Sequence, residues 1–562
     1  MLIGLVQFAP RIGEVTSNAE AMLEVAANAA DRGAAMVVFP ELSLVGYPPM
    51  DLLRDDILRE KCKLALESMA SRLRIPALVG APCWEDGTVY NAVYWICDNQ
   101  WTAAGRKVLL PNYDVFDESR YFQAGVECSI LRFGGMKILL SICEDLWAHD
   151  ADLKYPMDPI QKALDAFGQD VQFILNMAAS PYSIQGVSRR AHVLKTTAHR
   201  WDLPVLYVNQ VGARADLIFD GGTSVTLPGK DVRGVCPNFV PACALWDTDL
   251  NQCADTIIWT NNALVSTFTL NTDGQDPWKG EVVLGHRFNP GEITEALCLG
   301  IRDYLVMTGG KKVVIGLSGG VDSAVVLCLA VMALGAENIT ALLMPSGYSS
   351  GRSVEDSMEL CRMHGVAYQI LSIEESFRAV IGTLNAQWDE QSAALTEENI
   401  QPRLRALFLM AYSNQYGAMW LNSSNKSEAA VGYSTLYGDM GGGLSVIGDL
   451  YKTQVYALAA YWNSLKNWIP VSILLAAPSA ELRPGQLDSD SLPPYPLLDA
   501  LLMDCIEGGQ DEGGLIRSGH DPELVRRVLG MLKRSEFKRY QMPPVLRVSS
   551  RSFGRGWRRS LV

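Results

Sequence analysis

The segment KVVIGLSGGVDS, residues 312–323, has the residue types and spacing of a phosphate-binding turn. An apolar, β-branched run leads into two glycines, and the apolar, helix-like run 324–334 follows. A strand, a glycine-rich turn and a helix start place backbone N–H groups around a phosphate. Ser318 and Ser323 can donate hydrogen bonds to phosphate oxygens, and Asp322 can hold a divalent cation. The segment therefore predicts a nucleotide phosphate site.

This turn is not the common P-loop, because no lysine follows its glycines. An ordinary glycine-rich turn between a strand and a helix is the alternative. SGGVDS resembles the pyrophosphate loop of the N-type ATP pyrophosphatases, which cleave ATP between the α and β phosphates and activate a carboxylate or carbonyl as its adenylate. The resemblance implies that the loop binds ATP through Gly316, Leu317, Ser318, Gly319, Gly320, Val321, Asp322 and Ser323.

Three reactive residues of the first half each follow a strand-like run at a point where the chain turns. They are Glu41 after VVFP, Lys107 in GRKVLLP and Cys143 after KILLSI. Taken alone, each is weak evidence, because a glutamate after a strand is often solvated and a buried cysteine is usually inert. Their common placement predicts that the three strand ends meet.

With their flanks, these residues resemble the nitrilase superfamily, over about residues 1–265 and including FDGGTSV at 219–225. The resemblance implies an α-β-β-α sandwich that hydrolyses amides. By resemblance Cys143 is the nucleophile, Glu41 the base and Lys107 the group that stabilises the oxyanion. These residue types suit amide hydrolysis. A thiolate attacks the amide carbon, a carboxylate takes the thiol proton, and an ammonium stabilises the negative charge on the oxygen of the tetrahedral intermediate.

The resemblance also implies residues that contact glutamine. Glu118 matches a further glutamate that many members hold beside the lysine, and Tyr113 and Ser180 match substrate contacts. Tyr113 could instead be a packing aromatic. His149, six residues after Cys143, could suggest a Cys–His pair, but we expect a surface residue because the nitrilase pattern needs no histidine.

The bulk composition is that of a globular α/β protein of more than one domain. At 562 residues the chain is too long for one core, and length alone suggests three or four domains, or two large ones. The net charge of −14 argues against nucleic-acid binding. The tail from Arg526 onward is basic, which favours a solvated face or a subunit contact, with phosphate binding as the alternative.

Cysteine use and apolar runs predict a cytoplasmic protein without a membrane anchor. The 12 cysteines form no CxxC pair, so neither a zinc site nor a disulfide framework is indicated. The start MLIGLVQFAP lacks the basic segment and long apolar core of a signal peptide. The longest apolar runs are too short to span a bilayer.

The chain divides into two βα-rich halves. In the first half, helix-like stretches at 18–32 and 158–167 lie among short apolar runs, which predicts a sheet covered by helices. The predicted strands are 2–8, 36–39, 77–80, 138–142, 173–177 and 205–208. We predict an amidohydrolase domain at 1–268, a linker at 269–292 and a synthetase domain at 293–562.

The second half predicts a doubly wound parallel sheet with its ligand at the carboxyl ends of the strands. A helix near 293–309 precedes the strand that carries SGGVDS, and a second strand, 339–344, follows one helix later. Such a domain is of the Rossmann-like, adenine nucleotide α-hydrolase-like kind.

Five further segments narrow the function. With the amidase half in front, they resemble the glutamine-dependent NAD synthetases, and the resemblance covers essentially the whole chain. It implies that deamido-NAD⁺ is adenylated by ATP with Mg²⁺ and amidated with ammonia from glutamine, in a homo-oligomer. The segments are 398–417, 421–443, 449–459, 478–502 and 537–556.

Residue roles in the second half come from the same resemblance. Ser423 and Lys452 are ATP contacts, and residues 345–357 resemble a mobile loop that closes over ATP. The implied Mg²⁺ ligands are Asp322 and Glu428, and the implied deamido-NAD⁺ contacts are Asn399, Glu428 and Lys538. On local grounds Asn399 could instead cap a helix at 400–409, Lys452 and Lys538 could be solvated, and Tyr348 could be a packing aromatic.

Two segments depart from the family pattern. Residues 422–424 read Asn-Ser-Ser where Thr-Thr-Gly is usual, and the lost glycine predicts an altered local backbone. Gly186 stands where the family commonly has a lysine, six residues after Ser180. Two alternatives stay open: an amidotransferase that adenylates a different carboxylate, and a protein whose first half is only a scaffold and whose substrate is free ammonia.

Overall fold

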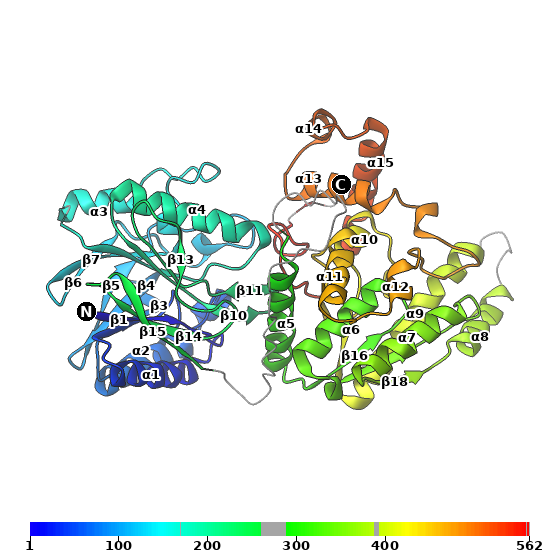
Figure 1. Ribbon diagram of the computed structural model, residues 1–562, viewed down its shortest axis with the longest axis horizontal. Helices are drawn as coiled ribbons and strands as arrows, with labels where there is room; N and C mark the ends of the chain where they lie inside the picture. The colour runs from blue at the N-terminus through cyan, green and yellow to red at the C-terminus, as the bar shows by residue number, and fades with distance from the viewer. Residues whose placement is uncertain (169, 260–287, 387–392, 558, 561–562) are drawn as a thin grey trace. The chain divides into compact units, whose positions relative to one another are not determined.

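The computed structural model describes residues 1–168, 170–259, 288–386, 393–557 and 559–560. The chain divides into two compact units, Met1–Val265 and Ser266–Val562, each of which has its own sheets and core (Figure 1). The predicted boundary at 268 and most of the predicted linker lie outside the described residues, so the linker stays a prediction. The predicted helix 293–309 is observed as α5 (Pro290–Met307).

The first unit contains a seven-stranded mixed sheet. Neighbouring strands β1, β2 and β3 are parallel, and the remaining pairs are antiparallel. Their side chains alternate between two cores: Ile3 and Leu5 face one, and Val6 faces the other. In spatial order the strands are β15 (Gln252–Ile258), β14 (Ala242–Asp247), β1 (Leu2–Gln7), β2 (Met36–Val38), β3 (Ala77–Glu85), β4 (Thr88–Cys97) and β5 (Gln100–Arg106).

A second sheet of six strands packs against the first. Ile138 and Ile174 of the second sheet share one core cluster with Ile3 and Leu78 of the first, so this core lies between the sheets. A hairpin of β10 (Val211–Arg214) and β11 (Leu217–Asp220) stands apart from both sheets. The six strands are β13 (Arg233–Gly234), β12 (Ser224–Thr226), β9 (Val205–Asn209), β8 (Phe173–Ala178), β7 (Met136–Ile142) and β6 (Ser129–Phe133).

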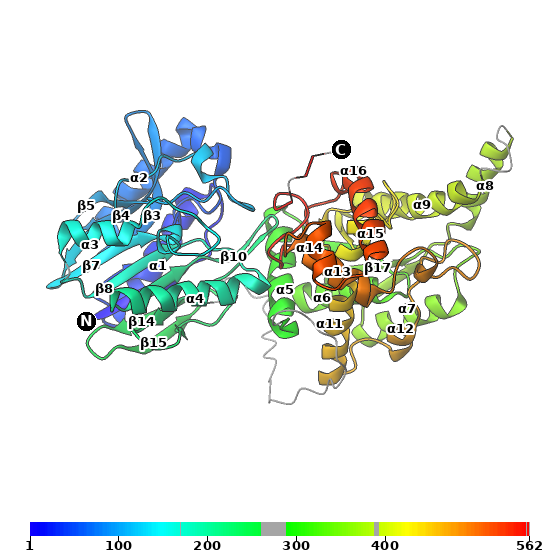
Figure 2. The ribbon, with the colours of Figure 1, turned by 90° about the horizontal axis from the view of Figure 1, so that it is seen from above.

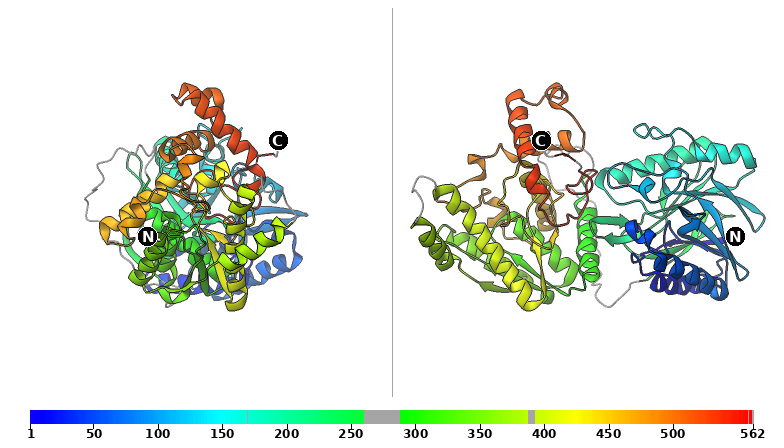
Figure 3. Two further views of the ribbon diagram at one scale, coloured as in Figure 1. Left: turned by 90° about the vertical axis from the view of Figure 1, so that its right-hand side faces the viewer. Right: turned by 180° about the vertical axis from the view of Figure 1, so that it is seen from behind.

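Helices cover both outer faces of this pair of sheets. Amphipathic helices α1 (Val15–Asp31) and α2 (Asp56–Arg72) pack on the first sheet, and α3 (Pro159–Phe167) and α4 (Ile184–Trp201) pack on the second. Figure 1 shows this order of layers, and Figure 3 shows it again from behind. The predicted α-β-β-α sandwich is confirmed.

The second unit is built on a five-stranded parallel sheet. Its spatial order is β18 (Ala367–Ile370), β17 (Ile339–Leu343), β16 (Lys312–Gly316), β19 (Ala418–Asn422) and β20 (Leu444–Ser445). The chain moves outward from β16 to β18 and then returns to place β19 on the other side of β16. The strand order therefore reverses between β16 and β19, which is where an open α/β sheet binds its ligand.

Helices lie on both faces of this sheet, which confirms the predicted doubly wound fold. Helix α6 (Val321–Leu334) is apolar on all sides and almost fully buried, packed by α5 and by α11 (Lys452–Leu465). On the other face α9 (Ala393–Tyr416) packs against β16 and β19, with α8 (Glu374–Asn385) beside it. The helix after β17 is α7 (Gly351–His364), with α12 (Val471–Leu475) against it.

The C-terminal helices pack with one earlier helix in a subdomain, and Figure 2 shows the C-terminal ones as a group near the C-terminus. Phe553 and Trp557 of the tail are buried in its core. The tail is not uniformly solvated, because Arg539 and Arg547 are buried, so the predicted solvated face is wrong at these positions. The helices are α10 (Lys426–Val431), α13 (Tyr495–Ile506), α14 (Glu512–Arg517), α15 (Pro522–Arg534) and α16 (Glu536–Arg539).

All 12 cysteines lie within the described residues and are free thiols. Among the described helices, none combines the length and the apolar character needed to cross a membrane.

Candidate active sites

The Cys143 turn lies directly after β7 and begins the short 3-10 helix Cys143–Leu146. Cys143 has a φ of 43°, a left-handed conformation that is uncommon for a side chain with a Cβ. Asp145 holds the turn, since its carboxylate accepts hydrogen bonds from the backbone N–H of Ile142 at 2.9 Å and of Val108 at 3.0 Å. The same carboxylate therefore ties the nucleophile turn to the segment that follows Lys107.

A buried lysine between two carboxylates forms the centre of this site. Lys107 Nζ lies 2.8 Å from Glu41 Oε1 and 2.8 Å from Glu118 Oε1, and all three side chains are at most 5% exposed. Asn91 donates to Glu41 Oε1 at 2.7 Å, and the Tyr47 hydroxyl donates to Glu118 at 2.8 Å. The structure thus places the predicted base Glu41 and the further glutamate Glu118 on either side of the predicted oxyanion-stabilising Lys107.

Backbone packing fixes the position of Glu41. The N–H of Ala179, after β8, donates to Glu41 Oε2 at 2.7 Å, and Gln210 donates to the Glu41 carbonyl at 2.7 Å. Gly80 of β3 lies so close that a Cβ there would sit 2.3 Å from the Pro40 carbonyl oxygen. A side chain at Gly80 would therefore displace the Glu41 segment.

The electrostatics of the cluster favour a resting neutral thiol. Burial raises the pKa of Cys143 well above its usual value, and the Glu41 carboxylate adds to this while Lys107 opposes it. Burial would lower the pKa of Lys107, but Glu118 and Glu41 raise it well above its usual value. Burial also raises the pKa of Glu118 to about 7. A base is thus needed to deprotonate Cys143, and Glu41 lies in electrostatic range of the thiol.

Of the predicted glutamine contacts, Tyr113 lies beside Glu144, the residue after the nucleophile, and Ser180 lies beside Asn209. Glu144 accepts hydrogen bonds from the Tyr113 hydroxyl at 3.0 Å and from the Tyr155 hydroxyl at 2.7 Å. The Ser180 N–H donates to Asn209 at 2.8 Å. Sequence reasoning missed Glu144, although its position directly after Cys143 was an available signal. Tyr155, Asn91 and Asp145 had no local signal.

His149 lies on the surface, as expected. Its ring is 40% exposed and its Nε2 is paired with Asp158 at 2.7 Å.

In the second unit, the SGGVDS loop forms a tight turn between β16 and α6. Gly319 has a φ of +80°, and a Cβ there would lie 2.5 Å from the Ser353 carbonyl oxygen, so only glycine fits. Gly320 has a φ of −89° and caps α6, so of the two glycines only Gly319 has a positive φ. Ser318 and Ser323 hydroxyls lie 3.2 Å apart and hold the turn closed.

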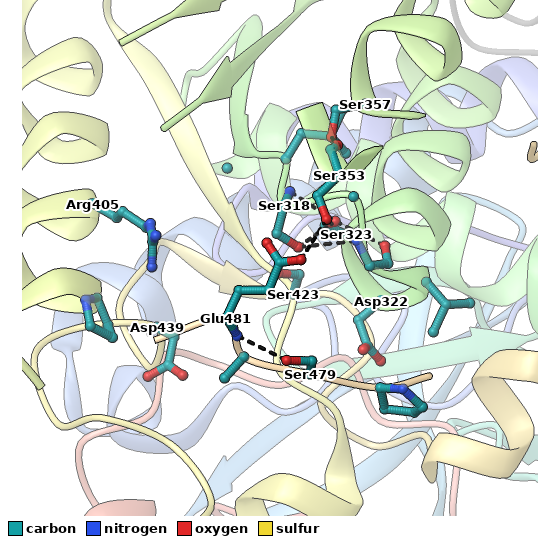
Figure 4. A pocket seen from close by; sticks show the side chains of 18 of the residues that line it. Ser318, Asp322, Ser323, Ser353, Ser357, Arg405, Ser423, Asp439, Ser479 and Glu481 are labelled. Carbon is teal, nitrogen blue, oxygen red and sulfur yellow. Dashed lines mark hydrogen bonds between the residues drawn. The ribbon is translucent and has the colours of Figure 1, made fainter. Parts of the chain in front are cut away.

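A cavity of about 290 Å³ opens over this loop, at the carboxyl ends of β16 and β19. All eight predicted loop residues line it, as do the predicted Ser423, Glu428 and Lys452. Figure 4 shows Glu481 at its centre, where the carboxylate accepts a hydrogen bond from the Ser353 hydroxyl at 2.8 Å. Sequence reasoning did not single out the lining residues Arg405, Asp439 and Glu481.

The predicted mobile loop 345–357 is only partly a loop. Its residues from Gly351 onward form the first two turns of α7, capped by Ser350. Tyr348 packs edge-on against Phe377, as the alternative for this residue proposed.

Asn399 and Lys538 are not part of this cavity lining. They meet instead at the chain after α10: Thr435 donates to Asn399 Oδ1 at 2.8 Å, and Lys538 Nζ donates to the carbonyls of Gly432 at 2.8 Å and Ser434 at 2.6 Å. Asn399 lies inside α9, so the alternative of a helix cap is wrong. Lys538 is not a freely solvated lysine either.

A second lysine between two carboxylates stands beside the SGGVDS loop. Lys452 Nζ lies 2.5 Å from Asp322 Oδ2 and 3.2 Å from Glu428 Oε1, and Asn425 donates to Asp322 Oδ1 at 3.0 Å. Burial raises the pKa of Glu428 to about 8, although Lys452 opposes the shift. Asp322 and Glu428 thus face a single cationic position.

This donor set fits a magnesium ion that is shared with a nucleotide. No group of three or more His, Cys, Asp or Glu side chains in the described ranges could hold a metal by itself. Mg²⁺ takes one or two protein carboxylates and completes its octahedron with phosphate oxygens and water. Asp322 and Glu428 could supply the two carboxylates.

Side-chain hydrogen bonds hold the segment 422–424, where Asn-Ser-Ser replaces the usual Thr-Thr-Gly. Asn422 accepts from the Ser424 N–H at 2.9 Å and donates to the carbonyls of Asp439 at 2.6 Å and Gly441 at 2.8 Å. Ser424 is not among the residues with positive φ, so this position does not require glycine; the expected change relative to the family backbone stays a prediction.

Comparisons with known proteins agree across the whole chain. Residues 2–256 match the family model for carbon-nitrogen hydrolases, and residues 293–543 match the model for NAD synthase. Two relatives, the glutamine-dependent NAD(+) synthetases of a Synechocystis species and of Thermotoga maritima, are each 38% identical to this chain. Each alignment covers 99% of this chain and 97% of the relative. The chain belongs to the glutamine-dependent NAD(+) synthetase family.

A solved structure of the family has the same fold. The glutamine-dependent NAD⁺ synthetase of Acinetobacter baumannii, in complex with ADP, is 34% identical and aligns with a TM-score of 0.74, covering 100% of this chain and 98% of that one. The two matched family ranges leave residues 257–292 between them, the region in which the linker is predicted.

A buried ion network holds α10, the helix that carries Glu428 of the synthetase site. Lys426, between Asn425 and Glu428, is fully buried and lies 2.8 Å from Asp449 and 2.5 Å from Glu507. It also donates to the Ser549 hydroxyl at 2.8 Å. Lys426 therefore joins α10, which carries Glu428, to the C-terminal segment.

We predict that Lys426→Met destabilises the second unit by about 3–5 kcal/mol, because Asp449 and Glu507 would lose their buried cation. Urea unfolding followed by fluorescence would measure the loss. Lys312→Met, at an exposed position on β16, is the control and should change stability by less than about 0.5 kcal/mol. Equal stability of the two variants would contradict the role of Lys426.

Proposed function

We propose that the protein is a glutamine-hydrolysing NAD⁺ synthetase, a carbon–nitrogen ligase that uses glutamine as the amide nitrogen donor. The observation that carries this proposal is the presence of two complete constellations in one chain. One is the Cys143 turn beside Glu41 and Lys107, and the other is the SGGVDS loop beside Lys452. The first suits amide hydrolysis and the second suits adenylation of a carboxylate by ATP.

In the amidase unit, Glu41 takes the proton of the neutral Cys143 thiol as sulfur attacks the side-chain amide of glutamine. Lys107, already held by Glu41 and Glu118, stabilises the oxyanion of the tetrahedral intermediate. Ammonia leaves with the proton from Glu41, and water then hydrolyses the thioester to glutamate with Glu41 again as base. We assign Tyr113, Ser180 and Glu118 to the glutamine site.

In the synthetase unit, the nicotinate carboxylate of deamido-NAD⁺ attacks the α-phosphorus of ATP and pyrophosphate leaves. Ammonia then attacks the acyl-adenylate and displaces AMP, which leaves NAD⁺. Loop 316–323 donates its N–H groups to the phosphates, Lys452 and Ser423 contact ATP, and Asn399, Glu428 and Lys538 contact deamido-NAD⁺. Mg²⁺, held by Asp322 and Glu428 when bound, would neutralise charge on the phosphates.

Two alternatives are separated by simple assays. An amidotransferase for another carboxylate would not convert deamido-NAD⁺, and a protein with a scaffold-only first half would use ammonium salts but not glutamine. The buried Glu41–Lys107 pair beside Cys143 favours a working amidase. Purified protein with ATP, Mg²⁺, glutamine and deamido-NAD⁺ should form NAD⁺, AMP and glutamate in equal amounts. We also place the protein in the cytoplasm.

Cys143→Ala should lower glutamine-dependent NAD⁺ formation by about 10³-fold or more and leave ammonium-dependent formation unchanged, because only the ammonia supply needs the thiol. The rates of NAD⁺ formation with glutamine and with ammonium chloride would be compared. Cys62→Ala, another buried cysteine of the same unit, on α2, is the control. Loss with both nitrogen donors would contradict the assignment.

Asp322→Asn should lower synthesis with either donor by about 10²-fold or more, because adenylation precedes amide formation and needs the carboxylate next to the phosphates. Pyrophosphate release and NAD⁺ formation would be followed together. Glutamine hydrolysis by Cys143 serves as the internal control and should continue. Near-normal synthesis from ammonium would refute the role.

We propose finally that a homo-oligomer conducts ammonia internally, since free ammonia at neutral pH is mostly ammonium, which is not nucleophilic. With ¹⁵N-amide glutamine and excess unlabelled ammonium, most of the NAD⁺ amide should carry ¹⁵N, and light scattering should show an assembly. A monomer whose product nitrogen follows the bulk ammonium would overturn this proposal.

A further inference from the structure

Recognition of glutamine requires more than an amide-hydrolysing centre, and this inference rests on the proposed function. Glutamine differs from other primary amides by its α-carboxylate and α-ammonium groups. A site that selects it needs a cation placed for the carboxylate, since charge-assisted hydrogen bonds are the strong and specific ones. Gly186, at the position where the family pattern has a lysine, supplies none.

Lys107, Arg189 and Arg190 are cations of the amidase unit that lie in electrostatic range of Cys143 or contact a residue near it. The Lys107 side chain is 1% exposed and already paired with the Glu41 and Glu118 carboxylates. Arg190 is 9% exposed and paired with Asp220, with its Nη1 at 3.1 Å from Oδ1. Arg189 is 39% exposed, so it is the one of the three that a ligand can reach from solvent.

Arg189 lies against the segment that ends the Cys143 turn. Its guanidinium is 5.6 Å from the ring centre of Trp147, the residue that caps the 3-10 helix begun by Cys143. Its hydrogen bond to Asp150 raises the pKa of Arg189, and Tyr113 adds to the shift, which places the charge within electrostatic range of that phenol. Arg189 thus lies beside Trp147, four residues after the nucleophile, and within electrostatic range of Tyr113.

The hydrogen bonds of Arg189 leave one edge of the guanidinium available. Nε donates to Asp150 Oδ2 at 2.8 Å, and Nη2 contacts Asp150 and lies 3.2 Å from Asp152. Among the described residues, Nη1 has no hydrogen-bond partner. Asp150, whose side chain is 8% exposed, therefore orients the guanidinium without using all of its donors.

Arg189 supplies a cation on the face of α4 that carries Gly186. Residues 186 and 189 are three apart on α4 and share a face, and helical side chains lean toward the helix N-terminus. The Arg189 side chain therefore leans toward the helix end at which Gly186 lies. We propose that Arg189 binds the α-carboxylate of glutamine, held in place by Asp150 and Trp147, and so determines the selectivity for glutamine.

The test compares Arg189→Ala with Lys195→Ala, which removes an exposed α4 cation paired with Asp231 at 2.6 Å. Each variant receives glutamine, the glutamine analogue whose α-carboxylate is a carboxamide, or ammonium chloride, and NAD⁺ formation is measured. Arg189→Ala should lower kcat/KM for glutamine about ten- to hundredfold, mainly through KM, because a charge-assisted contact is lost. Its kcat/KM for the analogue and its rate with ammonium should stay unchanged, and Lys195→Ala should match wild type throughout.

Arg189→Gln, which keeps a planar polar group beside Trp147 without the charge, should show the same selective loss. Equal losses for glutamine and for the analogue would assign Arg189 a structural role and overturn the proposal, and so would an unchanged KM for glutamine. Failure of the wild-type protein to use glutamine while it uses ammonium would instead overturn the proposed function itself, and this inference with it.

Discussion

The cost of burying charge is the constraint on which both sites depend. In each unit a lysine ammonium is held between two carboxylates: Lys107 between Glu41 and Glu118, and Lys452 between Asp322 and Glu428. A lone buried charge is penalised by several kcal/mol, and removing one partner of a buried group leaves the others uncompensated. Each cluster is therefore stable only when the lysine and both carboxylates, which come from distant segments of the chain, lie close together.

The two folds meet this requirement in different ways. In the sandwich, residues just past the ends of β2, β5 and β7 converge beside the core between the sheets, and close contact at Gly80 fixes where Glu41 lies. In the parallel sheet, the reversal of strand order between β16 and β19 opens a cavity at the strand ends. Rigid strands thus set the positions of the charged groups, and short turns set their orientation.

A second layer of residues holds these charged groups in place. Asp145 joins the Cys143 turn to the segment after Lys107, and Asn425 both caps α10 and donates to Asp322. Lys426 ties the same helix to Asp449 and the C-terminal segment. These residues contact no proposed reacting atom, yet each bond they make satisfies a buried polar group that would otherwise oppose folding. The proposed chemistry of both sites depends on them.

The α-β-β-α sandwich was implied by the nitrilase resemblance. The sequence by itself determined a sheet covered by helices in the first half, a doubly wound parallel sheet in the second, the SGGVDS loop and the positions of Glu41, Lys107 and Cys143. These are local patterns, in which residue type and strand or turn propensity coincide over a few positions. Only the tertiary structure decided that Asn399 and Lys538 meet at the chain after α10, outside the lining of the phosphate cavity, and that Ser424 needs no positive φ. It also decided that Asp145 and Lys426 hold the two sites and that Arg189 lies against Trp147. Their roles depend on contacts between segments far apart in the chain or on helix faces, which no local pattern encodes.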